Sequence, residues 1–168
     1  MVVMTPKSLL TKPEAVSSLE DFAEGTKFQE VLADPEVPGP KDEIDRIVFC
    51  SGKVYYDLLE ERDARGIDDI YLLRVEQFYP FPAQSAVQEL ERFKNAEVVW
   101  CQEEPKNQGA WTFIEPNIEW VLGKIDAKHQ RPKFVGRAAS ASPATGLAST
   151  HKKQQAALVN DALTIEGN

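Results

Sequence analysis

The fold is decided by one stretch of the sequence, Val98-Val99-Trp100-Cys101-Gln102-Glu103-Glu104-Pro105-Lys106-Asn107-Gln108-Gly109-Ala110-Trp111. Its first four residues are β-branched, aromatic or otherwise apolar, which is typical of a buried strand. The polar residues, the proline and Gly109 that follow predict an elbow leading into a helix from Trp111. In an open parallel sheet the carboxyl ends of the strands carry recognition chemistry, so Glu103 and Glu104 are candidates for a site or a subunit contact.

The same alternation of strand and helix patterns extends to both sides of this stretch. Apolar strand patterns occur at 47–50, 70–75, 98–101 and 134–136, and helical patterns at 54–66, 87–93, from 111 onward with an interruption near Pro116, and 154–163. Strands that alternate with helices at this spacing predict an α/β fold. We expect a three-layer αβα arrangement in which a mostly parallel open sheet carries helices on both faces.

The chain of 168 residues is long enough for one well-buried domain. We expect an irregular lead-in over residues 1–43 and a compact domain over 44–168. In the lead-in, Pro13 fits the first turn of a helix, an apolar stripe follows, and Gly25 ends it. The three prolines and the glycine of residues 34–43 predict a linker without regular structure.

Composition excludes several classes of protein. The formal charge of -8 argues against a nucleic-acid binder. No apolar run approaches the roughly 20 residues that span a bilayer, and no signal peptide is evident, so we expect a cytoplasmic protein without a membrane partner. Cys50 and Cys101 fit reduced core thiols, and His129 and His151 lack neighbours at the spacing of metal ligands.

Two short motifs invite an anion. Ser51-Gly52-Lys53 follows a strand and precedes a helix, whose free N–H groups can bind phosphate, but the longer glycine-rich span of a P-loop is missing. A plain turn with Lys53 in solvent is favoured. The small-residue run from Gly136 to Gly146 allows another backbone to lie close, as at a subunit interface, or is disordered, and Arg137 is its one residue able to bind an anion through two hydrogen bonds.

Three polar side chains lie at the end of the otherwise apolar strand pattern at 70–75. Arg74 and Glu76 fit a buried or interfacial ion pair, because a parallel strand cannot leave charges unpaired against the core. Gln77 suits either an anchor for its loop or a contact to a ligand amide or ribose.

The carboxylates of the central stretch admit an acid–base role, but strand neighbours point to opposite faces. We therefore expect one of Glu103 and Glu104 to face a neighbouring element or subunit and the other to face solvent, without a catalytic pair. Asn107 is expected to cap the following helix, Trp111 to pack, and Gly109 to permit a close approach.

Four motifs together carry a family resemblance. They are Phe-Cys-Ser-Gly-Lys-Val-Tyr-Tyr-Asp-Leu (49–58), Arg-Val-Glu-Gln-Phe-Tyr-Pro-Phe-Pro (74–82), Trp-Cys-Gln-Glu-Glu-Pro-Lys-Asn-Gln-Gly-Ala-Trp (100–111) and Gly-Arg-Ala-Ala-Ser-Ala-Ser-Pro-Ala-Thr-Gly (136–146). In order and spacing they closely resemble the C-terminal domain of the 2-oxoglutarate dehydrogenase decarboxylating component. The lead-in motif Met-Thr-Pro-Lys-Ser-Leu-Leu (4–10) is similar too.

The resemblance implies a transketolase C-terminal-domain-like fold within a larger homodimeric enzyme. In that family the full chain uses thiamine diphosphate and magnesium, decarboxylates 2-oxoglutarate in the citric acid cycle and passes the succinyl group to a dihydrolipoyl succinyltransferase. Its Gly-Asp-Gly type cofactor signature lies upstream and does not occur here. We therefore expect no catalytic residue, no metal ligand and no bound cofactor in this chain, which packs against its own upstream domains and a second copy.

The resemblance also implies effector binding, since some relatives bind acetyl-CoA or AMP in this domain. Lys27 and Gln77 stand at matching effector positions. Glu30 replaces a serine of the acetyl-CoA binders, and Gln84 and Ser85 replace two arginines, which disfavours a polyphosphate. A weaker mononucleotide site, such as one for AMP, stays open.

The expected site residues form two groups. Effector contacts are assigned to Lys27, Lys53, Gln77 and Arg137, and interface contacts to Arg74, Glu76, Glu103, Glu104, Asn107, Gln108 and Trp111. Two other interpretations stand beside this one: a stand-alone regulatory module that senses a nucleotide, and the matching domain of a related 2-oxo acid decarboxylase.

Overall fold

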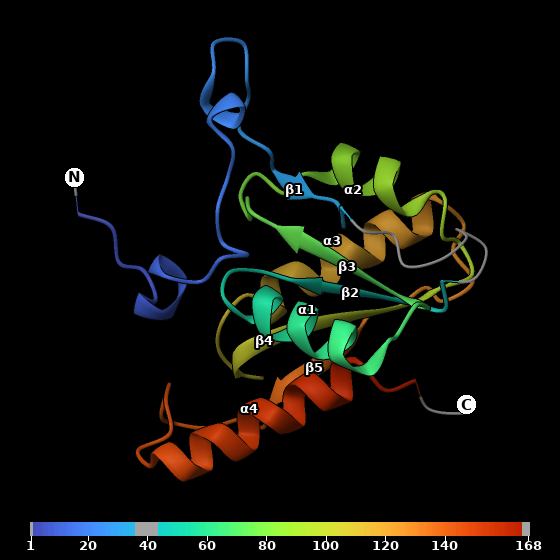
Figure 1. Ribbon diagram of the computed structural model, residues 1–168. Helices are drawn as coiled ribbons and strands as arrows, with labels where there is room; N and C mark the ends of the chain where they lie inside the picture. The colour runs from blue at the N-terminus through green and yellow to red at the C-terminus, as the bar shows by residue number, and fades with distance from the viewer. Residues whose placement is uncertain (1, 36–43, 166–168) are drawn as a thin grey trace.

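The computed structural model describes residues 2–35 and 44–165, and within them five strands form one open sheet (Figure 1). The strands are β1 Val31–Leu32, β2 Arg46–Cys50, β3 Ile70–Val75, β4 Glu97–Pro105 and β5 Lys133–Arg137. Their spatial order is β1-β3-β2-β4-β5. The pairs formed by β2 with β3, β2 with β4 and β4 with β5 are parallel, and only β1 runs antiparallel to its neighbour β3. The expected mostly parallel open sheet is confirmed.

Helices cover both faces of this sheet, which gives the expected three layers (Figure 1). The helices are α1 Val54–Arg65, α2 Ala83–Leu90, α3 Trp111–Lys124 and α4 Ala148–Ala162. Successive side chains of a strand point to opposite faces. Ile47 and Phe49 therefore join the core under α2 and α3, while Val48 and Cys50 join the core under α1 and α4.

Three element bounds differ from the sequence expectation. Helix α3 continues through Pro116, because this residue removes only one backbone donor while the buried face of the helix, including Ile114 and Ile118, packs on the sheet. Helix α4 begins at Ala148 rather than at 154. Strand β4 runs to Pro105, so Glu103 and Glu104 lie in the strand and not in the elbow after it.

The lead-in does not contain the helix expected between Pro13 and Gly25. Within residues 2–35 the helical segments are two short 3-10 helices, at Lys7–Leu10 and Leu19–Phe22, and Phe22 is 76% exposed. The apolar stripe has no surface to cover in this chain, because the lead-in extends away from the sheet (Figure 1). Packing of an apolar face supplies most of the stability of helices in proteins, and that packing is missing here.

The end of the lead-in nevertheless joins the domain. Strand β1 pairs with β3, and Asp34 behind it is buried and forms an ion pair with the equally buried Arg62 of α1. The Asp34 carboxylate also accepts a hydrogen bond from the backbone N–H of Leu72, at 3.1 Å. Most of the expected linker, residues 36–43, lies outside the described residues, so the boundary at residue 43 stays a prediction.

Candidate functional site

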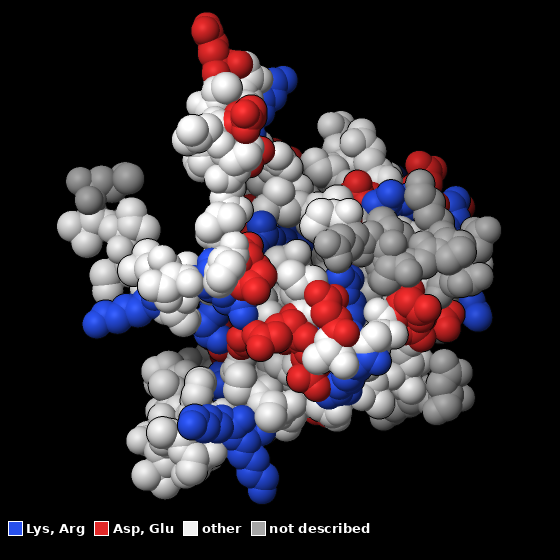
Figure 2. All heavy atoms as spheres, viewed as in Figure 1, with Lys and Arg blue, Asp and Glu red and all other residues white. Residues whose placement is uncertain are grey.

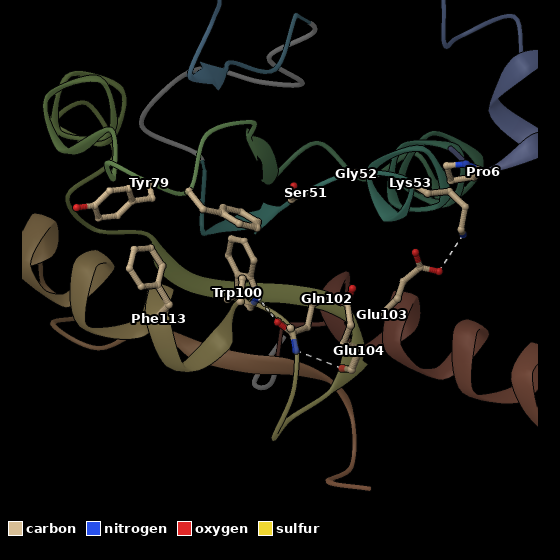
Figure 3. A pocket seen from close by; sticks show the side chains of 13 residues that line it. Pro6, Ser51, Gly52, Lys53, Tyr79, Trp100, Gln102, Glu103, Glu104 and Phe113 are labelled. Carbon is tan, nitrogen blue, oxygen red and sulfur yellow. Dashed lines mark hydrogen bonds and ion pairs between the residues drawn. The ribbon is translucent and has the colours of Figure 1, made fainter. Parts of the chain in front are cut away.

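A pocket of about 630 Å³ opens at the carboxyl ends of β2, β3 and β4 (Figure 3). Its lining combines the turn after β2, the loop after β3, the end of β4 and the start of α3. The lining residues are Pro6, Ser51, Gly52, Lys53, Phe78, Tyr79, Trp100, Gln102, Glu103, Glu104, Gly109, Ala110 and Phe113. This is the edge at which open α/β sheets place their ligand or partner contacts. We call it the carboxyl-edge pocket.

One end of the carboxyl-edge pocket is aromatic. The rings of Phe78 and Trp100 meet edge to face, with 6.0 Å between their centroids. Trp100 is buried, whereas Tyr79 is 82% and Phe113 is 40% exposed. Tyr79 and Phe113 lie on the side of the pocket away from Lys53 (Figure 3). Exposed aromatic side chains beside a hollow are typical of contacts to another molecule or domain.

The other end is charged and already paired within the chain. The Lys53 ammonium lies 2.9 Å from a Glu103 oxygen and 2.8 Å from an Asp57 oxygen. Burial lowers the pKa of Lys53, but the hydrogen bonds to Asp57 and Glu103 outweigh it, so that the pKa is raised above the ordinary value. The expectation that Lys53 stands free in solvent is wrong, because the long β4 places Glu103 beside it.

Gln102 organises the floor of the carboxyl-edge pocket, and sequence reasoning missed it. Its side-chain oxygen accepts hydrogen bonds from the indole N–H of Trp100, at 2.8 Å, and from the backbone N–H of Trp111, at 3.1 Å. Its side-chain nitrogen donates to the carbonyl of Gln108, at 2.7 Å. The amide therefore joins the end of β4 to the first turn of α3.

Two glycines make room for Gln102. A Cβ at Gly109, which has a φ of +67°, would lie 2.8 Å from the side-chain nitrogen of Gln102, and a Cβ at Gly136 would lie 2.8 Å from its backbone oxygen. The close approach expected at Gly109 is confirmed. A signal for this cluster was present in the sequence as a buried-strand glutamine between two tryptophans with a glycine nearby.

The polar elbow holds the neighbouring loop instead of capping α3. Asn107 exchanges two hydrogen bonds of 3.0 Å with the backbone of Ser140, and the side chain of Gln108 donates a third to the Ser140 carbonyl. The N-cap position is Ala110, so the capping role expected of Asn107 is wrong. Trp111 is buried and packs against Phe134, which confirms its packing role.

Glu103 and Glu104 divide as expected, since Glu103 faces Lys53 while Glu104 is exposed. Arg137, on β5, donates hydrogen bonds to the backbone carbonyl of Glu103 and to the side-chain oxygen of Gln155. The structure thus brings Lys53, Glu103 and Arg137 together near the ends of β4 and β5.

The polar residues at the end of β3 and just after it form a separate cluster. The Arg74 guanidinium stacks on the ring of Tyr55, at 4.4 Å from its centroid, and lies 3.5 Å from a Glu76 oxygen. The ion pair between Arg74 and Glu76 is confirmed, at the edge of the core. Gln77 donates to the carbonyl of Pro80, at 2.9 Å, so it anchors its loop.

The expected effector positions carry a carboxylate. Glu30 accepts a hydrogen bond from the Ser85 hydroxyl, at 3.2 Å, and lies 3.5 Å from the side-chain nitrogen of Gln77. Lys27 is exposed nearby in the chain. The contacts of Glu30 with Gln77 and Ser85 do not include Lys53 or Arg137, and the group at their centre is the Glu30 carboxylate.

The described side chains offer little for covalent chemistry. Cys50 and Cys101 are both buried free thiols, and burial raises the pKa of Cys101 to about 12 and that of Cys50 well above its ordinary value. Within residues 2–35 and 44–165 no three His, Cys, Asp or Glu side chains gather in a way that could hold a metal ion. In the same ranges no helix is both long and apolar enough to cross a bilayer.

Acidic side chains gather over α1 (Figure 2), which is unlike a nucleic-acid surface.

Comparison with known proteins adds the family. The family model described as "2-oxoglutarate dehydrogenase C-terminal" matches residues 16–163. The 2-oxoglutarate dehydrogenase E1 component of Brucella anthropi is 58% identical over an alignment of 172 positions, gaps included, which covers 97% of this chain and 17% of the relative. The E1 component of Brucella ovis is 57% identical, and its alignment likewise covers 97% of this chain and 17% of the relative. The chain thus spans less than a fifth of the length of these relatives.

The match covers both the sheet with its helices and the loops that build the carboxyl-edge pocket. A family model over most of the chain and relatives that are more than half identical point the same way. The chain belongs to the 2-oxoglutarate dehydrogenase C-terminal family.

Proposed function

We propose that this chain is the C-terminal part of a thiamine diphosphate- and magnesium-dependent 2-oxoglutarate dehydrogenase E1 component that acts in the cytoplasm. The larger enzyme decarboxylates 2-oxoglutarate and transfers the succinyl group to a dihydrolipoyl succinyltransferase. The names of the relatives and the 17% of their length that this chain matches support this assignment.

The role of this part is structural and not catalytic. Its buried thiols have raised pKa values, Lys53 at the carboxyl edge is paired with Asp57 and Glu103, and the described residues offer no cluster of metal ligands. These residues do not fit thiamine diphosphate or magnesium, so the described part of this chain holds neither cofactor. Both cofactors are assigned to the part of the enzyme that precedes it.

The carboxyl-edge pocket is the contact surface of this part. The observation that carries this proposal is its open aromatic end, where Tyr79 and Phe113 are exposed beside the buried Trp100. Upstream domains or a second copy in a homodimer would cover these rings. The interface residues at this edge include Glu104, which is exposed, and Glu103, which is partly exposed. Arg74 and Glu76 extend the contact surface from the end of β3.

Effector binding is proposed only for a mononucleotide. Lys27 is exposed, whereas Gln77 already donates to the Pro80 carbonyl, and the Glu30 carboxylate between Gln77 and Ser85 repels a polyphosphate. We therefore expect AMP to be the stronger effector candidate. Acetyl-CoA is expected to leave the melting temperature of the chain unchanged in a thermal-shift titration, and a saturable rise would contradict this expectation.

A chimaera tests the proposed function. The matching C-terminal part of the Brucella anthropi E1 component is replaced by this chain, and reduction of ferricyanide is measured with 2-oxoglutarate, thiamine diphosphate and magnesium. We expect turnover from the chimaera and none from this chain alone. Loss of turnover in a folded chimaera, or turnover by the isolated chain, would overturn the assignment.

A further inference from the structure

A second and much smaller pocket lies between the loop after β5 and helix α4. Its volume is about 60 Å³. It is lined by Pro105, Arg137, Ala138, Ser140, Ser142, Pro143, Ala144, Thr145 and Gln154. This cavity, the Arg137 pocket, shares no lining residue with the carboxyl-edge pocket.

Unsatisfied polar atoms concentrate at the Arg137 pocket. Among the described residues, five buried side-chain nitrogen or oxygen atoms lack a hydrogen-bond partner, and three of them belong to residues that line this cavity. They are Nε of Arg137, Oγ1 of Thr145 and Oε1 of Gln154. Leaving such atoms buried without a partner is costly, so their gathering around one cavity indicates that an occupant satisfies them.

The charge at the cavity indicates what kind of occupant fits. The Arg137 guanidinium donates to two neutral acceptors, the Glu103 carbonyl and the Gln155 amide, and contacts the ring of His151 at 3.3 Å. None of the ion pairs found among the described residues involves Arg137, and no acidic side chain lines the pocket. A partly buried cation favours a counter-charge.

The surroundings are cationic as well. Lys152 and Lys153 follow His151 in the first half of α4, and basic side chains lie over this end of the helix (Figure 2). Both lysines are exposed, so they attract an anion without filling the cavity.

Size narrows the ligand further. A single water needs only about 10–15 Å³ of such space, whereas a drug-sized ligand needs roughly 300 Å³ or more. A volume of about 60 Å³ matches a small oxyanion and excludes a whole nucleotide. The Thr145 hydroxyl can donate to an anion, and so can the Gln154 amide after a half-turn about its last torsion.

We propose that the Arg137 pocket binds a small free oxyanion of the phosphate or carboxylate type, held by Arg137, Thr145 and Gln154. The bound anion supplies the counter-charge of Arg137 and fastens the loop over residues 138–145 to α4. The proposal concerns this chain alone and does not depend on the function proposed above.

Titration of the 168-residue chain with inorganic phosphate tests the proposal, with ³¹P line broadening as the readout and chloride keeping the ionic strength constant. We expect saturable binding that is about tenfold weaker in Thr145→Val, which loses one hydrogen bond to a charged group. Arg137→Lys keeps the charge but loses Nε–H and is expected to weaken binding at least as much. Lys152→Gln is the matched control, because it removes a nearby charge that does not line the pocket.

Each result of the phosphate titration either supports the site or contradicts it. Weaker binding in Thr145→Val with little change in Lys152→Gln supports the site. Equal binding in all variants, binding lost only in Lys152→Gln, or no saturable binding of phosphate or of acetate in a parallel titration overturns it. A crystal soaked in selenate gives a second readout: an anomalous peak within hydrogen-bonding distance of Arg137 Nε supports the proposal, and water alone in the pocket contradicts it. Because Thr145→Val is nearly isosteric, the test stands even where Arg137→Lys does not fold.

Discussion

The two ends of the sheet differ in whether this chain covers its own side chains. At the amino end, the buried Arg46 of β2 forms an ion pair of 2.6 Å with Glu97 of β4, and Lys133 of β5 pairs with the same carboxylate. Arg46 also donates to the backbone carbonyls of Asp161, Ala162 and Thr164, at and just beyond the end of α4. The charges of the amino end are therefore paired within the chain, although among the described residues Nε of Arg46 and Oε1 of Glu97 are buried without a hydrogen-bond partner.

The carboxyl end is closed only in part. Lys53 pairs with Asp57 and Glu103, but Glu104 and the aromatic ring of Tyr79 are exposed. Residues at the amino end are accounted for by stability alone, whereas the aromatic edge is accounted for only by something that this chain does not contain. Changes at the amino end should therefore lower the stability of this chain, whereas changes at the aromatic edge should weaken its assembly with the rest of the enzyme.

The largest expected loss of stability comes from breaking the amino end with Arg46→Met. This change leaves the last carbonyls of α4 without their donor and removes one of two cations from Glu97, while Lys133 still compensates the carboxylate. We expect the free energy of unfolding to fall by about 2–4 kcal/mol in urea denaturation. Arg65→Met, which breaks the exposed pair with Glu61, is the control and should cost less than about 0.5 kcal/mol. Equal losses in both variants would contradict the difference between the ends.

A smaller effect at the same end depends on pH. Burial raises the pKa of Glu97, but the hydrogen bond from Lys133 and the charge of Arg46 outweigh it, so the pKa is lowered from the ordinary value of 4.5. A lowered pKa in the folded state means that the carboxylate stabilises the fold above the ordinary pKa, and that this stability is lost as the pH falls through the lowered value.

Glu97→Gln measures this contribution. The variant should show a flatter decrease in the free energy of unfolding between about pH 6 and pH 3 than the unchanged chain, because it lacks the titrating group. Glu104→Gln, at an exposed position of the same strand, is the matched control for the removal of one carboxylate. A slope for Glu97→Gln that equals the slope of the unchanged chain would show that the pairing with Arg46 and Lys133 does not stabilise the fold.

The sequence predicted the sheet because apolar strand patterns alternate with helical stripes, and buried packing then enforces them. The four parallel strands lie where the patterns at 47–50, 70–75, 98–101 and 134–136 indicated. The lead-in shows the limit of this reasoning. Its apolar stripe around Leu19 and Phe22 has helical spacing, but such a segment forms a stable helix only where its apolar face packs against another surface.

The site was predicted only in outline. The carboxyl end of β4 was the right place, since parallel strands meet at one edge, but the roles of single side chains depended on partners distant in sequence. Lys53 is paired because Glu103, fifty residues away, belongs to a strand longer than its apolar core. Gln102 was missed because a glutamine inside a strand carries no periodic signal, and its role appears only when Trp100 and Trp111 converge on it.

The smallest effect on stability is expected at the open end, from Tyr79→Ser. The Tyr79 side chain is 82% exposed, so its removal costs little buried apolar surface. The free energy of unfolding of the isolated chain should therefore change by less than about 0.5 kcal/mol. In the Brucella anthropi chimaera the same change should lower turnover or the stability of the assembly severalfold, because a covered aromatic ring contributes much of the energy of a contact. Tyr79→Phe, which keeps the ring, should restore both. A Tyr79→Ser chimaera that assembles and turns over like its parent would show that the aromatic edge faces solvent in the whole enzyme, and the contrast between the two ends would then concern stability alone.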